Sequence, residues 1–459
     1  MSLFGSLTSA ARSLEAQQYG LDVTGQNIAN LSTPGYSRRT ALLASIGAAD
    51  SLSAGGGVEI QGLYAARDAM VDRRLLQEMP DEARERSLSE ALALVETALG
   101  APGKSLDDQL TAYFDAFSKL SEDPLSATAR QEAVLSGQKL AASFHDLSAR
   151  LQLSARDANL RVKAGVDDLN ASISRIAALN RAIAGAGSNP AQVETLKDQQ
   201  SVEVQKLAGL VGVEAIQRAD GGVDLSFAGG HALVIGDQSY AVSAVATGLS
   251  GYYDIQAGGV SVTAQVTSGT LGGQLYARDT AIPDYLADLD QLAFTLVGEV
   301  NTLHDAGYDR SGVDAPVFFD ALGGVSGAAA AISVNAAVVA DPNLVAAGGA
   351  AGAPGDNQQA RAIANLRDAR VLSGSTATFS DAWGNLLYKV GTDAQASRFE
   401  QGTRAEIVRQ VQNLRDSVSG VSLDEEAMLM LKFQRAYEAN ARFFSAVDDS
   451  IQVLLSLKR

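Results

Sequence analysis

Apolar residues recur every seven positions at both ends of the chain. Within residues 422–457 the repeat consists of Leu423, Met430, Tyr437, Phe444 and Ile451. The first thirty residues carry a matching repeat, formed by Leu7, Leu14, Leu21 and Ile28. Such a repeat keeps one face of a helix against a partner helix, as in a coiled coil. The pattern predicts two terminal helices, of about 43 and 54 Å at 1.5 Å per residue.

Two arrangements remain open for these helices. Each apolar face can pack on a core of its own, as ordinary amphipathic helices do. Alternatively, the two helices can meet at one end of an elongated molecule. The match in period and length between the two ends favours the second arrangement, and we therefore expect a rod.

Most of the chain between the terminal helices has a helical pattern. The longest helix is expected between Pro124 and Gly185, on the order of 80 Å at 1.5 Å per residue. Helical periodicity covers, in chain order, residues 88–120, 140–183, 193–207, 283–304 and 356–419.

The apolar period changes from 3.6 to 2 at Val211. Residues 213–275 are rich in Gly, Val, Ser and Thr with several paired glycines, which predicts a small antiparallel β domain. Two further strands are expected at 39–46 and 58–64, after Pro34 ends the first helix. Residues 308–356 are irregular and rich in Ala and Gly, with short strand candidates at 317–319 and 332–334.

Together these patterns predict an α+β fold that is mostly α. A coiled coil formed by both termini and a long helical bundle make up most of it, and a small antiparallel β domain is inserted. In this nested layout the β domain should lie farthest from the termini. The expected domains are 1–65 with 420–459 (coiled coil), 66–210 with 278–307 and 356–419 (helical bundle), and 211–277 with 308–355 (inserted, β-rich and outermost).

Composition narrows the function classes. The 459-residue chain has a net charge of −17, which disfavours nucleic acid and anionic membrane surfaces as partners. It contains no cysteine, so disulfides and thiol chemistry are excluded. The sequence contains no run of about 18 apolar residues, so no membrane span is expected. Residues 1–6 lack the basic and apolar regions of a secretory signal, so any export is expected to proceed without a cleaved signal peptide.

No catalytic, cofactor or metal site is expected from the sequence. The three histidines, His145, His231 and His304, are isolated from one another and from carboxylates at ligand spacing. Residues 309–320 resemble a calcium loop only faintly, because the glycine is misplaced and the closing glutamate is missing, so a turn is favoured.

Two terminal motifs suggest a family. Residues 27–38, Asn-Ile-Ala-Asn-Leu-Ser-Thr-Pro-Gly-Tyr-Ser-Arg, resemble the N-terminal signature of bacterial flagellar rod, hook and hook-associated proteins. Residues 419–427 and 431–439, followed by Leu-Leu-Ser-Leu at 454–457, are similar to the C-terminal signature of that family. The Pro-Gly-Tyr-Ser-Arg variant and the long helical middle resemble the hook-associated proteins of the hook–filament junction.

The resemblance implies a non-catalytic structural adaptor, secreted by the flagellar type III apparatus without signal cleavage. Its implied partners are further copies of itself, the hook protein, a second junction protein on the filament side and an export chaperone. Under this interpretation neighbouring subunits mask the terminal apolar faces, so we expect mobile ends in the monomer and a Phe444 side chain buried only after assembly. The expected assembly residues are Leu7, Leu14, Leu21, Asn27, Ile28, Asn30, Thr33, Pro34, Gly35, Tyr36, Leu423, Met430, Phe433, Tyr437, Phe444, Val447, Ile451 and Leu454.

Three other functions remain as alternatives. A hook or distal-rod protein shares both terminal motifs but is expected to have a body richer in strands than residues 86–210. A wall-cutting muramidase carried on a flagellar scaffold needs a cleft with two carboxylates. A coiled-coil adhesin does not account for the flagellar signatures at both ends.

Overall fold

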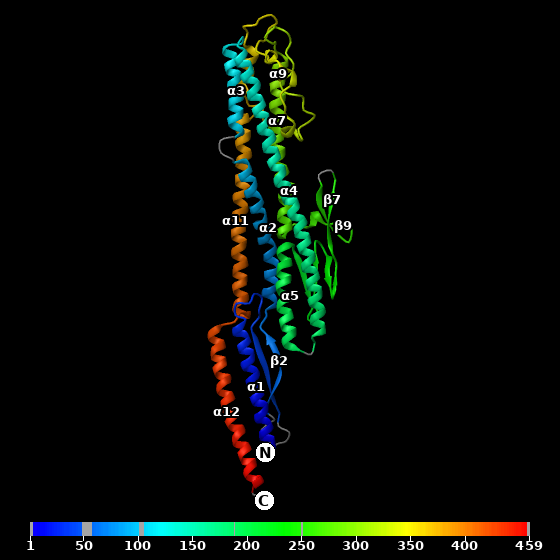
Figure 1. The fold of residues 1–459 in the computed structure, drawn as a ribbon, viewed down its shortest axis with the longest axis vertical. Helices are drawn as coiled ribbons and strands as arrows, with labels where there is room; N and C mark the ends of the chain where they lie inside the picture. Colours follow the sequence, from blue (N-terminus) through cyan, green and yellow to red (C-terminus); the bar gives the residue numbers. More distant parts are fainter. Residues whose placement is uncertain (1–2, 48–56, 101–104, 188, 249–250, 457–459) are drawn as a thin grey trace.

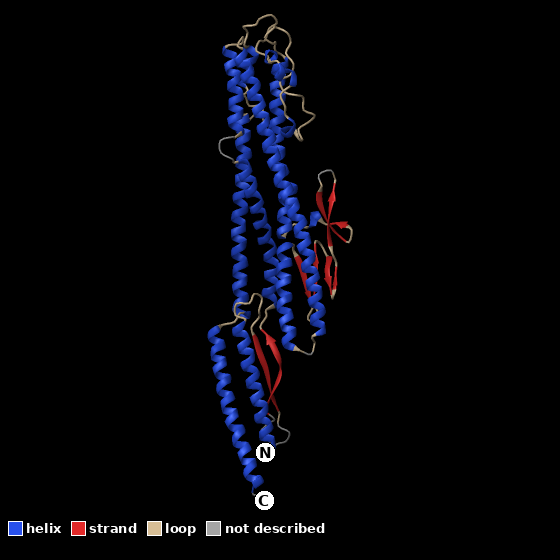
Figure 2. Ribbon diagram, in the orientation of Figure 1, coloured by secondary structure: helices blue, strands red, loops and turns tan. Residues whose placement is uncertain are grey.

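A computed structural model describes residues 3–47, 57–100, 105–187, 189–248 and 251–456. The molecule is long and narrow, and both chain ends lie at the same end of its long axis (Figure 1). Helices run along most of its length and the strands form small antiparallel sheets (Figure 2). The predicted α+β, mostly α class is therefore confirmed.

Most helices begin and end close to the positions that the periodicity indicates, but one begins at Ala69 instead of 88, and the expected helical region 356–419 contains two helices. They are α1 (Leu3–Ala29), α2 (Ala69–Leu99), α3 (Leu106–Glu122), α4 (Ala127–Gly185), α5 (Pro190–Leu210), α6 (Gly269–Tyr276), α7 (Ile282–Asp305), α8 (Ala328–Ala331), α9 (Ala336–Ala340), α10 (Gln358–Asn365), α11 (Phe379–Ser419) and α12 (Leu423–Ser456). The strands are β1 (Arg39–Ile46), β2 (Gly57–Ala65), β3 (Val213–Gln217), β4 (Val223–Phe227), β5 (His231–Ile235), β6 (Gln238–Ser239), β7 (Val242–Thr247), β8 (Tyr252–Ala257) and β9 (Val260–Ser261).

We call α1, β1, β2 and α12 the terminal unit. In it α1 and α12 lie side by side, and β1 pairs with β2 in an antiparallel hairpin against α1 (Figure 1). The remaining long helices, α2, α3, α4, α5, α7 and α11, form the helical body. The chain passes from body to terminal unit twice, between β2 and α2 and between α11 and α12.

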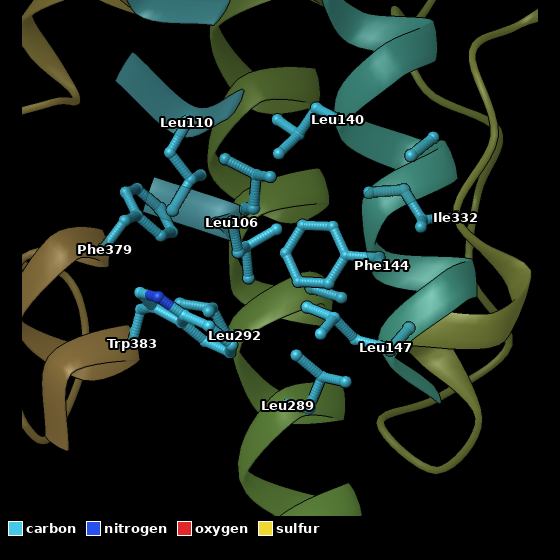
Figure 3. Close-up of a cluster of buried hydrophobic side chains, with 14 of the residues drawn as sticks. Leu106, Leu110, Leu140, Phe144, Leu147, Leu289, Leu292, Ile332, Phe379 and Trp383 are labelled. Carbon is cyan, nitrogen blue, oxygen red and sulfur yellow. The ribbon is translucent and has the colours of Figure 1, made fainter. Parts of the chain in front are cut away.

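The core of the helical body contains many leucine and aromatic side chains, and α2 contributes Leu88, Leu92 and Val95 to it. Side chains of α3, α4, α7 and α11 converge in the upper body, where Phe144 and Trp383 lie among leucines (Figure 3). Side-chain caps fix the starts of three of these helices: Ser105 caps α3, Ser126 caps α4, and Thr378 forms a capping box with Asp381 at α11.

The expectation of strand structure up to Leu275 is wrong, because residues 269–276 form α6, which continues through a π-helical turn at Ala277–Ala281 into α7. Leu271 and Leu275 are buried one helical turn apart. The glycine pair 272–273 suggested a strand turn, but at Gly273 it permits close helix packing. A Cβ there would lie 2.5 Å from the carbonyl oxygen of Arg84 in α2.

The β module, strands β3 to β9, packs along α4. Three asparagines on α4, spaced about three turns apart, anchor it, because each binds both the backbone N–H and a carbonyl of the module. Asn170, for example, donates to Val242 O at 2.7 Å and accepts from Val242 N at 2.9 Å. The module lies beside the middle of the rod, so the expectation that it lies farthest from the termini is wrong (Figure 1).

Residues 308–355 form the end of the rod opposite the termini (Figure 1). They do not join the β module, as the expected domain 211–277 with 308–355 required, but belong to the core of the upper body. The reason is the fully buried pair Phe318–Phe319. Phe318 packs edge-to-face on Tyr113 and Phe117 of α3, and the Phe319 ring lies tilted against Tyr113. The expected strands at 317–319 and 332–334 reduce to one bridge, between Phe319 and Val334.

Two buried side chains tie this end to the helices. His304 of α7 pairs through Nδ1 with the carbonyl of Pro316 at 2.6 Å, and its Nε2 accepts from the Ala346 N–H at 2.9 Å. Arg130 of α4 donates to the carbonyls of Pro124 and Val345. The loop that resembled a calcium site is a turn, because the Asp309 carboxylate accepts from the backbone N–H groups of Ser311 and Val313.

Candidate assembly interface

The two terminal apolar repeats meet within one chain. In α12, Met430, Phe444 and Ile451 are half-buried and Val447 is buried. The Phe433 ring lies against Gly20 of α1, where a Cβ would be only 2.7 Å from the ring. The expectation that Phe444 is buried only after assembly is therefore wrong, because α1 already covers much of this face of α12.

The deepest face of α1 is not its leucine line. Leu7, Leu14, Leu21 and Ile28 are half-buried. The fully buried positions carry smaller residues, which lie between α12 and the β1–β2 hairpin: Ala10, Ala16, Gly20, Val23, Thr24 and Asn27. Small side chains allow both neighbours to approach the helix closely, so the unit packs on two sides of α1.

Asn27 joins the two ends of the chain. Its side chain is 1 % exposed, and its Nδ2 donates to Arg39 O at 2.8 Å and to Glu426 Oε2 at 3.0 Å. Its Oδ1 accepts from the Arg39 N–H at 3.0 Å and from the Tyr36 hydroxyl at 2.8 Å. Both donors and both lone pairs of the amide are therefore used.

Glu426, also 1 % exposed, is the acceptor at the start of α12. Its second carboxylate oxygen accepts from Arg38 Nε at 2.7 Å, and Arg38 also pairs with Glu425 at 3.0 Å. The Arg38 backbone N–H donates to Ser419 O at 2.8 Å, at the last residue of α11. Burial raises the pKa of Tyr36, and the Arg39 guanidinium stacked on its ring offsets part of that rise.

The turn after α1 is docked on α5 of the body. Gly35 has φ +77°, and a Cβ there would lie 2.3 Å from Val202 Cγ2, so both its conformation and its neighbour require glycine. Asp198 of α5 accepts from Arg39 Nη2 at 3.0 Å and from Arg67 Nη2 at 2.7 Å.

Arg67 also pairs with Glu194 of α5. Burial acts to raise the pKa of Glu194, but the charges of Arg67 and Lys197 outweigh it and hold that pKa below its usual value. Arg39 of β1 and Arg67, just after β2, thus meet two carboxylates of one body helix.

The remaining expected assembly residues differ in exposure. Asn30, Gly35 and Tyr36 are half-buried, whereas Thr33, Pro34, Leu423, Tyr437 and Leu454 are exposed. The structure also exposes large apolar side chains outside the heptad lines, which the repeat could not identify because they do not follow its period. They are Phe4, Leu31, Leu42, Leu43, Tyr64, Met428, Leu431, Phe443, Val453 and Leu455.

Two negative findings concern the described part of the chain. None of its helices is long and apolar enough to cross a membrane. Within the same residues, no group of three or more histidine and carboxylate side chains is arranged to hold a metal ion.

Comparison with protein families gives three matches. Residues 92–341, more than half of the chain, match the model of the flagellar hook-associated protein FlgK helical domain. Residues 7–36 match the flagella basal body rod protein family, and residues 415–457 match the C-terminal family of the flagellar basal body rod FlgEFG proteins. The two smaller matches fall on α1 with its following turn and on α12.

Individual relatives match over nearly their full length. Flagellar hook-associated protein 1 of Bacillus subtilis is 27% identical over 99% of this chain and 98% of the relative. The protein of the same name from Escherichia coli is 24% identical over 98% of this chain and 99% of the relative. The solved structure of the flagellar hook junction protein FlgK from Burkholderia pseudomallei superposes with a TM-score of 0.68 at 16% identity, over 75% of this chain and 100% of that chain.

Proposed function

This chain belongs to the family of flagellar hook-associated proteins defined by the FlgK helical domain, and we propose that its terminal unit is the part that assembles. The protein is a structural adaptor of the bacterial flagellum that self-assembles at the hook tip and joins hook to filament. Nothing in the fold or the relatives favours a hook or distal-rod protein.

The observation that carries the proposal is the surface of the terminal unit. Its two helices cover only part of each other's heptad faces, and α12 still exposes Leu423 by 53 %, Met428 by 64 % and Leu431 by 58 %. Exposed apolar side chains gathered on one unit are typical of a protein–protein interface. We infer that these residues, with the exposed Tyr437 and Leu454, contact neighbouring subunits, while buried Asn27 and Val447 shape the unit from within.

The proposal extends to partners and export. The hook protein and a second junction protein on the filament side are the proposed neighbours along the axis, and an export chaperone is the proposed partner before secretion. Export is proposed to proceed through the type III route without signal cleavage. We further infer that the protein acts without catalysis, since its role requires binding surfaces alone.

Electron microscopy of a strain lacking the gene tests the function. We expect complete hooks without filaments, with flagellin released into the medium. Loss of the hooks themselves would favour a hook or distal-rod protein, and normal filaments would contradict any role at the junction.

Complementation then tests the surface. Leu431→Asp should leave hooks bare, because a charge replaces an exposed apolar contact, while the purified variant keeps its helical content. Gln434→Asp, at an exposed polar position on the same helix, is the matched control and should restore filaments.

A further inference from the structure

The outward face of α11 carries two exposed aromatic side chains. Tyr388 and Phe399 are each 76 % exposed, and they lie about three helical turns apart, so they point in the same direction. The buried positions Val390 and Ser397 lie on the opposite face of the helix, against the body. Single exposed apolar side chains are common on protein surfaces, but two aromatic ones on one face of one helix are typical of a contact surface.

The same side of α11 carries three glycines that no contact within the described chain requires. Outside the helix itself, no atom of the described residues lies within 4 Å of the position that a Cβ would take at Gly384, Gly391 or Gly402. Seven and eleven residues separate these positions, so they form one line beside the two aromatic side chains. Glycine inside a helix lowers its stability relative to alanine. This line adds to the aromatic pair because it leaves room for another helix to approach α11.

α4 has an outward apolar face of its own. Leu153 and Leu160 are 55 % and 58 % exposed, and they lie two turns apart, opposite the buried positions Leu151 and Val162. α2 packs against both α11 and α4, and these two helices lie on opposite sides of it (Figure 1). The outward faces of α11 and α4 therefore point away from each other, so they cannot meet within one chain.

The two faces lie at similar heights along the rod. Phe399 is two residues from Ser397, whose hydroxyl donates to Glu85 O of α2 at 3.3 Å. Leu160 precedes Arg161, which pairs at 4.0 Å with a carboxylate of α2 that lies five residues further on. Five residues of helix span about 8 Å, so Phe399 and Leu160 differ little in height. In each pair the other exposed side chain lies nearer the tip, so the two pairs cover overlapping stretches of the rod.

This geometry points to a second copy as the partner of both faces. Subunits that stand side by side around one axis present different faces to their two neighbours. The faces of α11 and α4 meet this requirement because they lie on opposite sides of the body at similar heights. They also continue the surface proposed for assembly, since exposed apolar side chains follow α11 through Leu414 and Val418 to Leu423 of α12.

We propose that the face of α11 marked by Tyr388 and Phe399 packs against the face of α4 marked by Leu153 and Leu160 in a neighbouring copy. The inference rests on the proposed self-assembly and adds a contact between the bodies to the contact between the terminal units. It removes two aromatic and two leucine side chains from water at each contact. Because each copy offers one face and receives the other, the contact repeats around an axis instead of closing as a pair.

Cysteine cross-linking in assembled flagella tests the proposal, since the chain contains no cysteine. Gln395→Cys places a thiol between the two aromatic side chains, and Asp157→Cys places one between the two leucines; both positions are exposed. A bismaleimide that spans about 10 Å, the distance between the axes of packed helices, should link copies of the double variant into a ladder of multimers.

Two controls accompany the cross-linking. Each single-cysteine variant should give no ladder, because the contact joins unlike faces. Gln395→Cys combined with Ser243→Cys, an exposed position on β7 of the β module, should also give none.

A substitution at one of the exposed glycines provides a second readout. Gly402→Leu fills the line beside Phe399 and should leave most hooks without filaments. Gly298→Leu is the matched control, since Gly298 is an exposed glycine of α7 that also has open space around it, and it should restore filaments. Leucine favours a helix more than glycine does, so both purified variants should keep their helical content.

The outcomes separate this inference from the proposed function. Protein absent from the hook tip in electron micrographs would overturn both. Protein present at the tip would overturn only the contact between α11 and α4 if the double variant gave no ladder, if a single variant gave the same ladder, if the cross-link joined a different protein, or if Gly402→Leu restored filaments.

Discussion

Replacing Asn27 by Asp tests how the two ends of the chain are held together. The substitution keeps the size of the side chain but exchanges the Nδ2 group, 3.0 Å from Glu426 Oε2, for a second carboxylate oxygen. Two unit charges 3 Å apart repel by about 5 kcal/mol at an effective dielectric constant of 20. Protonating one ordinary carboxyl at pH 7 costs only about 4 kcal/mol, at 1.36 kcal/mol per pKa unit. Because protonation costs less than the repulsion, one carboxyl should take up a proton, and the cost of that protonation limits the destabilisation. The contact between α1 and α12 should therefore weaken by about 4 kcal/mol at pH 7.

Hydrogen exchange of the α12 backbone measures this loss. A weakening of about 4 kcal/mol raises the fraction of molecules in which α12 has separated from α1 roughly a thousandfold, since each 1.4 kcal/mol is tenfold. The exchange rates of the α12 amides should rise by the same factor. At pH 5 the protonation route costs only about 1.4 kcal/mol, so the variant should then differ from the wild type by about tenfold. The single tryptophan, Trp383, lies in the upper body and should report an unchanged unfolding transition there.

Asn30→Asp is the matched control. Asn30 is three residues further on, is half-buried, and its amide nitrogen contacts only Gln26 O, so the α12 exchange rates should change little. Equal protection of the α12 amides in Asn27→Asp and in the wild type at pH 7 would refute the inference that the Asn27–Glu426 hydrogen bond holds α1 and α12 together. A shift of the unfolding transition that Trp383 reports would show that the hydrogen bonds of Asn27 stabilise the body instead.

Three further predictions concern single side chains. Burial lowers the pKa of His304 to about 4. As the pH falls the unfolded chain therefore binds the proton first, so the free energy of unfolding should fall by up to about 3 kcal/mol from pH 6.5 to 4. When unfolding is followed by Trp383 fluorescence, the His304→Gln variant should lose this part of the pH dependence. Arg130→Met leaves buried carbonyls without donors and should lower the urea stability of the body by about 2–4 kcal/mol. Phe444→Asp should speed hydrogen exchange in α1 of the monomer, whereas unchanged exchange would mean that this face of α12 does not contact α1.

Periodicity predicted the long elements because each buries a regular face. The heptads located α1 and α12, and the 3.6-residue pattern located α4, α7 and α11. It could not reveal that α1 packs through small residues such as Ala16 and Gly20, because small side chains contribute little to an apolar repeat. Nor could it place residues 308–355, whose position depends on the adjacent aromatics Phe318 and Phe319 filling a gap beside Tyr113.

The hydrogen bond between Asn27 and Glu426 could not be predicted from sequence patterns for a different reason. Asn27 and Glu426 are 399 positions apart, and a buried asparagine at the end of a helix resembles an ordinary cap in sequence. The signature around Asn27 did mark the region as important, and we interpreted it as an interface between subunits. The hydrogen bonds show that Asn27 and Tyr36 also make contacts within the chain, while the exposed apolar residues of the terminal unit are the surface that we propose for assembly.

These two kinds of contact are suited to different tasks. Apolar contacts are non-directional, so they give affinity without fixing the angle between the parts that they join. The joint of Arg39 and Arg67 with Asp198 is directional, and buried ion pairs of this kind contribute little net stability because desolvation offsets their attraction. We therefore expect the joint to set the angle between the terminal unit and the body. An assembling adaptor needs that angle defined before its apolar surface meets a neighbour, since a variable angle would present the surface in many orientations.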